Sequence, residues 1–121
     1  MIEQIINNGE YRAPLFDKTK RLEQYAVTLP LEIRNEIDGV DIEQFVTDGI
    51  LDYMNAYEQE EYKDKVWVWV HALESFITIE GFINTDDEEE AKGLAEAFGY
   101  DCYFDLVEDE TIYFWDPRPS L

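Results

Sequence analysis

The chain has 121 residues and a formal net charge of −20, from 29 acidic and 9 basic side chains. Hydrophobic residues make up 45% of it and aromatic residues 15%, which excludes a disordered acidic tail because such tails lack the apolar surface needed to order a chain. Residues 1–60 hold 13 acidic and 5 basic residues and residues 61–121 hold 16 and 4. This negative field disfavours direct binding to DNA, RNA or anionic lipid.

One domain is expected at this length, spanning residues 1–121. Cys102 is the single cysteine, so an internal disulfide is excluded and a reducing compartment is favoured. The N-terminal residues lack the basic region, the apolar run and the cleavage site of a secretory signal, and no window is apolar for long enough to cross a bilayer. We therefore expect a cytoplasmic protein with no membrane partner.

The first elements predicted are an arm, a strand and a short helix. Residues 1–20 are weakly patterned and are expected to form a weakly ordered arm. Leu22–Leu29 has the composition of a strand that ends at Pro30, because proline cannot donate to a sheet ladder. Leu31–Ile37 is a candidate short helix, with Gly39 as its natural end.

The next segment predicts a longer helix capped by Asp41. Its apolar residues recur at three- and four-residue spacing from Ile42 to Tyr57, which gives one apolar stripe for a core or for a homodimer interface. Asp41, Asp48 and Asp52 are expected to project together from one edge of this helix. With the preceding strand and short helix it completes a strand–helix–helix unit over residues 22–60.

The segment 65–83 favours two strands. Val66, Val68 and Val70 alternate with Trp67 and Trp69, a period of two built from β-branched and aromatic residues. The segment has no Gly, Pro or Asn where the two strands would turn, so a single helix remains the alternative.

A helix followed by two strands is predicted for the rest of the chain. Thr85 and the acidic run Asp86–Glu90 begin the helix and Gly99 ends it. Strands are expected over Tyr100–Val107 and Thr111–Trp115, so residues 65–116 would form a sheet with one helix. The predicted fold class is α+β, a single domain with a helical N-terminal half packed on a small antiparallel sheet of β-β-α-β-β order in the C-terminal half.

No arrangement of residues points to catalysis. His71 and Cys102 are the only histidine and cysteine, no local motif pairs them as base and nucleophile, and Cys102 is expected in the core. Two such ligands are too few for zinc, and the run Asp86–Glu90 lacks the glycine and ligand spacing of a calcium loop. We expect neither an enzyme nor a metal or other cofactor.

The candidate binding residues are carboxylates and aromatic side chains. Trp and Tyr anchors surrounded by carboxylates suit an Arg-rich partner surface, whereas simple sheet packing is the alternative for the aromatic residues. The set comprises Asp41, Asp48, Asp52, Asp86, Asp87, Glu88, Glu89, Glu90, Asp101, Asp105, Glu108, Asp109, Glu110, Trp67, Trp69 and Tyr103.

Residues 25–33 and 45–53 carry a family resemblance. The strand ending in Leu29-Pro30 and the later segment Phe45–Tyr53 resemble a ribbon-helix-helix DNA-binding unit, although the first helix would be more than a turn short. The resemblance implies a dimeric regulator assembled through residues 22–57, with an acidic C-terminal domain and Arg21 needed for DNA binding.

The charge itself favours a different function. Rows of carboxylates on a compact domain can occupy a basic cleft built for nucleic acid and steer rapid association with it. The composition is similar to that of DNA-mimicking anti-restriction and anti-CRISPR proteins of phages and plasmids, and to that of immunity proteins or antitoxins that block nucleases. The sequence therefore predicts a non-catalytic inhibitor of a basic nuclease or other nucleic-acid-binding protein. An acidic domain without mimicry, as in halophilic proteins, remains an alternative.

Overall fold

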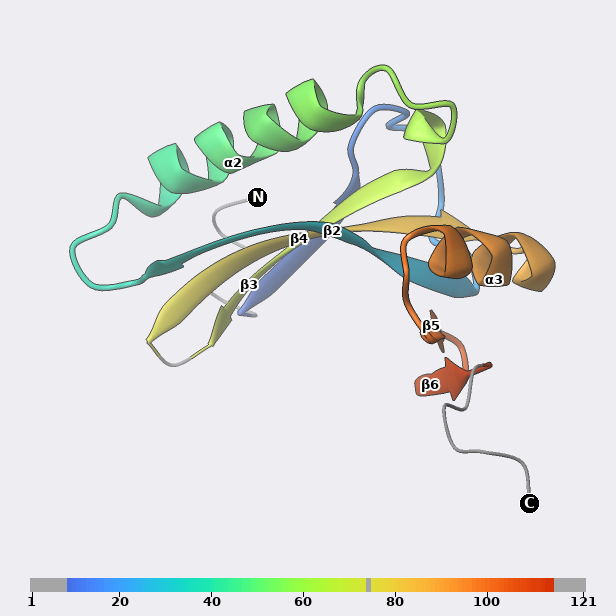
Figure 1. Ribbon diagram of the computed structural model, residues 1–121. Coiled ribbons are helices and arrows are strands. Elements are labelled where there is room, and N and C mark those ends of the chain that lie inside the picture. Colours follow the sequence, from blue (N-terminus) through green and yellow to red (C-terminus); the bar gives the residue numbers. More distant parts are fainter. Residues whose placement is uncertain (1–8, 74, 115–121) are drawn as a thin grey trace.

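The computed structural model describes residues 9–73 and 75–114, and in this part of the chain one antiparallel sheet organises the molecule. The strand order across the sheet is β1-β3-β4-β2-β5-β6 (Figure 1). The strands are β1 (Glu10–Pro14), β2 (Tyr25–Glu36), β3 (Val66–Leu73), β4 (Phe76–Thr85), β5 (Cys102–Asp105) and β6 (Glu110–Tyr113). The helices are α2 (Ile42–Tyr57), the 3₁₀ turn η1 (Lys63–Lys65) and α3 (Glu88–Ala97).

The predicted fold class was wrong. Both halves of the chain contribute strands to the same six-stranded sheet, and strand residues outnumber helical ones in the described part. No helical N-terminal half packs on a separate sheet, because β2 lies between β4 and β5 and is hydrogen-bonded to both. From β3 to β6 the elements follow the predicted order, but they form only part of the sheet.

The largest correction concerns residues 31–36, which continue strand β2 instead of forming a helix. Pairing with β4 is regular up to Thr28 and resumes at Glu32, with the irregularity between them centred on Pro30. A bulge is one of the few places where a sheet accepts proline, because a bulged residue is unpaired and the missing N–H of proline removes no hydrogen bond from the ladder. The strand–helix–helix unit and the arrangement implied by the ribbon-helix-helix resemblance are therefore absent from residues 22–60.

The predicted arm also contains a strand. Residues 1–8 lie outside the described part of the chain, but Glu10–Pro14 pairs with β3 as an edge strand. The sequence pattern of this strand is weak because it is short and contains a proline, which an edge strand tolerates since only one of its sides is hydrogen-bonded.

The two-strand prediction for residues 65–83 is confirmed. β3 and β4 pair without interruption from Val66 opposite Ile83 to Leu73 opposite Phe76. Both predicted longer helices are confirmed too. The Asp41 carboxylate accepts a hydrogen bond from the Gln44 N–H at the start of α2. The predicted cap of α3 was wrong, because Asp87 and not Thr85 caps the helix, while the Thr85 hydroxyl accepts a hydrogen bond from the Asp87 N–H.

Both helices pack on one face of the sheet. That face carries Val66, Val68, Val70, Ile77 and Ile79, all at most 2% exposed, and they pack with the buried residues of α2 and α3 in one core. Side chains alternate between the two faces of a strand, so Trp67, Trp69, Phe82 and Phe104 lie on the other face. We call this second, uncovered side the open face (Figure 1).

The C-terminal strands differ in detail from the prediction. β5 and β6 are each four residues long, and the predicted strand residue Trp115 lies outside the described part of the chain. Cys102 is half-buried on the side of Phe104, whereas Tyr103 points into the core, so the prediction of a core cysteine was wrong. In the described part, no helix has the length and apolar character needed to span a bilayer.

Candidate functional site

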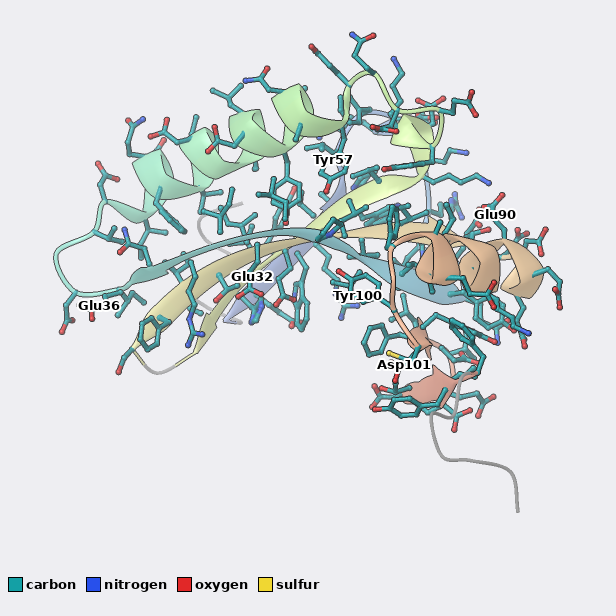
Figure 2. The ribbon with its side chains drawn as sticks, in the orientation of Figure 1. Glu32, Glu36, Tyr57, Glu90, Tyr100 and Asp101 are labelled. Atoms are coloured by element: carbon teal, nitrogen blue, oxygen red, sulfur yellow. The ribbon has the colours of Figure 1, made fainter. Side chains whose placement is uncertain are left out.

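Helix α2 and the residues on either side of it hold nine acidic residues with no intervening Lys or Arg. Val46, Gly49, Tyr53 and Tyr57 turn toward the sheet and are buried, which leaves the opposite side of the helix in solvent. Nine acidic residues and no Lys or Arg occur between Asn35 and Tyr62, and all nine are exposed. We call this set the α2 acidic surface: Glu36, Asp38, Asp41, Glu43, Asp48, Asp52, Glu58, Glu60 and Glu61 (Figure 2).

No ion pair compensates the α2 acidic surface. Among the described residues, the oppositely charged contacts are Arg12 with Glu10, Lys65 with Glu90, and a 3.6 Å approach of His71 to Glu80. All three lie outside the set. Because no cation of the described residues pairs with these carboxylates, their negative field extends into solvent.

The predicted acidic run at the start of α3 is partly tied into the fold. The Asp87 carboxylate accepts hydrogen bonds from the N–H groups of Glu89 and Glu90 and so caps the helix. Glu90 pairs with Lys65. Asp86 and Glu89 remain exposed on the helical side of the molecule.

Glu88 links α3 to the sheet through two tyrosines. Its carboxylate accepts hydrogen bonds from the Tyr25 hydroxyl at 2.7 Å and the Tyr103 hydroxyl at 2.9 Å. The hydrogen bond to Glu88 raises the pKa of Tyr25 to about 12, and burial together with the same carboxylate raises the pKa of Tyr103 to about 12. Tyr103 is thus a buried structural residue and does not reach the surface.

The turn between β5 and β6 holds the remaining predicted carboxylates. Asp105 is buried and accepts hydrogen bonds from the N–H groups of Val107 and Glu108 and from the Gln24 amide. The Glu108 N–H is the main cause that lowers the pKa of Asp105. Glu108, Asp109 and Glu110 are exposed, whereas Asp101 is half-buried. This group is separate from the α2 acidic surface, and Asp109 and Glu110 border the open face.

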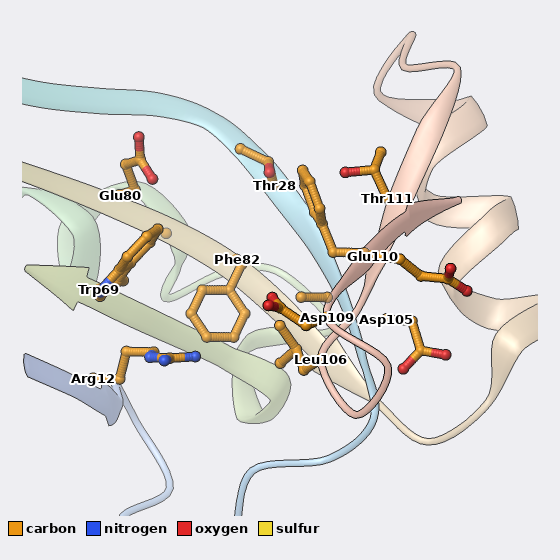
Figure 3. Close-up of a pocket in the computed structure, with 13 residues that line it drawn as sticks. Arg12, Thr28, Trp69, Glu80, Phe82, Asp105, Leu106, Asp109, Glu110 and Thr111 are labelled. Atoms are coloured by element: carbon orange, nitrogen blue, oxygen red, sulfur yellow. The ribbon is translucent and has the colours of Figure 1, made fainter. Parts of the chain in front are cut away.

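The open face carries a cavity that the sequence interpretation missed. The cavity has a volume of about 510 Å³, and Trp69, Phe82 and Phe104 form its aromatic lining (Figure 3). The signal was present in the alternation of β3 and β4, because both strands place large aromatic side chains on their second face. Of the predicted aromatic residues, Trp67 is 7% exposed and stacks on Phe82, whereas Trp69 reaches the cavity.

The two residues considered in the sequence as a base and a nucleophile, His71 and Cys102, are not brought together. His71 on β3 and Cys102 on β5 are separated by β4 and β2, which places them three strand spacings of about 4.8 Å apart. Burial raises the pKa of the Cys102 thiol, which makes it a poorer nucleophile. Within residues 9–73 and 75–114, no group of three or more potential ligands is placed to hold a metal ion.

Comparison with protein-family models, with curated proteins and with solved structures found no match for this chain. The residues and their geometry therefore carry the functional argument. The two features that they offer are the α2 acidic surface and the cavity on the open face.

Proposed function

We propose that the protein is a non-catalytic acidic binding protein that occupies a basic, nucleic-acid-binding surface of a target protein. The observation that carries this proposal is the α2 acidic surface, whose nine exposed carboxylates have no intervening Lys or Arg in the sequence and no ion pair with the residues that the structure describes. A basic cleft evolved for phosphates gains binding free energy from any rigid array of negative charge that fits it.

The α2 acidic surface is held on a rigid support. Tyr53, on the buried side of the helix, is hydrogen-bonded to the backbone of β2 and β4. Docking therefore requires little ordering of the backbone, which lowers the entropic cost of association.

The spacing of the carboxylates makes the mimicry partial. At a rise of about 1.5 Å per residue, Asp41 and Asp48 lie about 10 Å apart along the helix, and Asp48 and Asp52 about 6 Å apart. One DNA strand offers a phosphate every ~3.4 Å of axis. Because fewer charges are neutralised over the same length, we expect the affinity for the target to fall less steeply with salt than that of the DNA it displaces.

A charge-reversal pair tests this function. The Asp48→Lys/Asp52→Lys variant changes the α2 acidic surface by four charges, and Glu32→Lys/Glu96→Lys makes the same change on β2 and α3. All four positions are exposed, so both variants should fold. Each protein is immobilised and exposed to lysate, and the retained proteins are then challenged with duplex DNA.

We expect the wild type and the Glu32/Glu96 variant to retain the same basic nuclease or other nucleic-acid-binding protein. Duplex DNA should displace this protein, and the Asp48/Asp52 variant should fail to retain it. Its activity on nucleic acid should be inhibited by the same two proteins. Equal retention and inhibition by both variants would show that the α2 acidic surface is not the binding site. Release of all retained proteins at low salt, with no competition by DNA, would show that the charge serves no specific target.

A further inference from the structure

The open face presents an ordered aromatic surface that no helix covers in the described part of the chain. Strand register sets side chains in rows across the sheet, with Trp67 opposite Phe82 and Phe82 opposite Thr28. The neighbouring row runs from Arg12 through Trp69 and Glu80 to Glu32. Aromatic and charged side chains thus occur together on the open face. In most antiparallel sheets, a face that is not packed on the core is solvated and polar.

The β5–β6 hairpin makes one side of this face concave. Phe104 and Leu106 join Trp69 and Phe82 in the lining, and the turn residue Asp109 closes the far side (Figure 3). The volume of about 510 Å³ falls within the ~300–1,000 Å³ typical of small-molecule sites. The lining is mainly apolar with a few polar groups, which is the usual composition of a ligand pocket.

The cavity lining holds more carboxylates than cations, with Glu80, Asp105, Asp109 and Glu110 against Arg12. Figure 3 shows Glu80 on one side and the Asp109 carboxylate directed toward Phe82 on the other. Glu80 lies directly opposite Glu32 in the β2–β4 ladder, an arrangement of like charges that destabilises a sheet. His71 Nε2 already lies 3.6 Å from the Glu80 carboxylate, and the exposed carboxylates of the lining are those of Asp109 and Glu110.

The one basic residue in the lining is already engaged. Arg12 is 3.6 Å from Glu10, and its guanidinium lies over the Trp69 ring, 5.6 Å from the centroid. His71 also stacks on the Trp69 ring, at 4.1 Å between the ring centroids, so this ring already has two cationic or aromatic neighbours. The charge balance of the cavity is therefore unfavourable for an anion and favourable for a positively charged ligand.

We propose that this cavity binds a small organic cation that has an apolar body. The aromatic lining formed by Trp69, Phe82 and Phe104 receives the apolar body, and the ammonium group lies beside the Asp109 carboxylate. This site is on the opposite side of the sheet from the α2 acidic surface and does not depend on the proposed inhibitor function.

A matched series of probes separates charge from apolar contact. 2-Phenylethylamine, 2-phenylethanol and 3-phenylpropanoate share a phenyl ring and carry charges of +1, 0 and −1 at neutral pH. Binding is measured by calorimetry and by the NMR shift of the Trp69 indole N–H, which donates to Glu10. We expect saturable binding of the amine, at least ten-fold weaker binding of the alcohol and none of the propanoate. Equal affinity for amine and alcohol, or no saturable shift at Trp69, would overturn the proposal.

Three variants distinguish the cavity from the overall negative charge. Asp109→Asn removes one carboxylate at a position with φ of 53°, a conformation that Asn also tolerates, so the turn is preserved. Asp48→Asn removes the same charge from α2, on the other side of the sheet, and Thr111→Trp fills the cavity from the exposed β6 position.

We expect Asp109→Asn to weaken amine binding at least three-fold without changing alcohol binding, and Asp48→Asn to change neither. Thr111→Trp should abolish the binding of both probes while the amide spectrum of the core stays unchanged. If Asp48→Asn weakens the amine as much as Asp109→Asn does, the attraction is a property of the whole charge and the site is refuted. The Asp48→Lys/Asp52→Lys variant should keep the cavity intact, so failure of either proposal leaves the other testable.

Discussion

The Tyr53 hydroxyl accepts a hydrogen bond from the Gly81 N–H at 2.8 Å, which joins the middle of helix α2 to the central strand β4. The same hydroxyl donates to the Leu31 carbonyl on β2. Burial is the main cause that raises the pKa of Tyr53 above its ordinary value. This one side chain therefore fixes the helix that carries the α2 acidic surface against two strands.

Replacing Tyr53 with Phe should lower the free energy of unfolding by about 1–3 kcal/mol, because a buried N–H and a carbonyl lose their partner. Urea denaturation measures the change. Tyr62→Phe is the matched control, since its ring packs against Tyr57 and Phe98 and its hydroxyl makes no hydrogen bond within the described residues. Equal stability of both variants would mean that the Tyr53 hydroxyl contributes nothing to the fold.

Gly81→Ala should destabilise the protein by about 1–3 kcal/mol, the usual cost of overpacking a core. An added Cβ would lie 2.4 Å from Cε1 of Tyr53 and 3.1 Å from Leu29 Cδ1, and the Tyr53 ring is held by its hydrogen bonds. Gly93→Ala is the opposite case, because nothing lies within 4 Å of its Cβ in helix α3. That variant should gain about 0.5–1 kcal/mol from helix propensity. Thermal and urea unfolding of both variants test the difference in sign.

Asp105→Asn should destabilise the β5–β6 turn in a pH-dependent way. The folded protein lowers the pKa of Asp105, so its contribution to stability is present above the unfolded pKa and is lost as the pH falls through the folded value. The melting temperatures of wild type and variant should therefore differ at neutral pH and converge in acid. Glu108→Gln, an exposed change in the same turn, should shift the melting temperature much less. A difference that persists undiminished in acid would contradict the assignment.

The contacts of Glu88 predict a loss of stability in alkali. A phenol whose folded pKa is raised contributes stability that is complete below its unfolded pKa, near 10, and is lost as the pH approaches the folded value of about 12 for Tyr25 and Tyr103. Unfolding measured between pH 8 and 12 should show this decline. Glu88→Gln should make the decline shallower, because it removes the charge that opposes phenolate formation. An unchanged profile would show that Glu88 does not control these tyrosines.

The sequence predicted elements well where a local pattern was strong and failed at Pro30. The capped helix from Asp41 and the alternation from Val66 to Val70 depend on neighbouring residues, and both are confirmed. Pro30 was interpreted as the end of a strand because local rules cannot show that a partner strand bulges at that position. Half of β2 was therefore assigned to a helix, and this error led to the wrong prediction of a helical N-terminal half.

The candidate site shows a similar limit. Asp41, Asp48 and Asp52 were recognised from sequence because one capped helix carries them, whereas the other six carboxylates of the α2 acidic surface were not singled out. The cavity requires Arg12, Trp69, Phe82 and Phe104 to meet from strands β1, β3, β4 and β5. Sequence alone did not place Asp105 and Tyr103 among the buried residues either, because their roles depend on Gln24 and Glu88, which are distant in sequence.

The edges of the sheet have a consequence for assembly. The outermost strands β1 and β6 are five and four residues long, but β2 pairs with β5 only at Tyr25 and Ala26. In the described part of the chain, the rest of that side of β2, as far as Glu36, is therefore a third and longer edge, interrupted at Pro30. Long, flat edges are what amyloid-like stacking requires, and here each added copy would also bring a further charge of −20. Acidification neutralises the repulsion, so the unpaired side of β2 beyond Ala26 is the edge at which copies of the chain would first stack once the charge no longer keeps them apart.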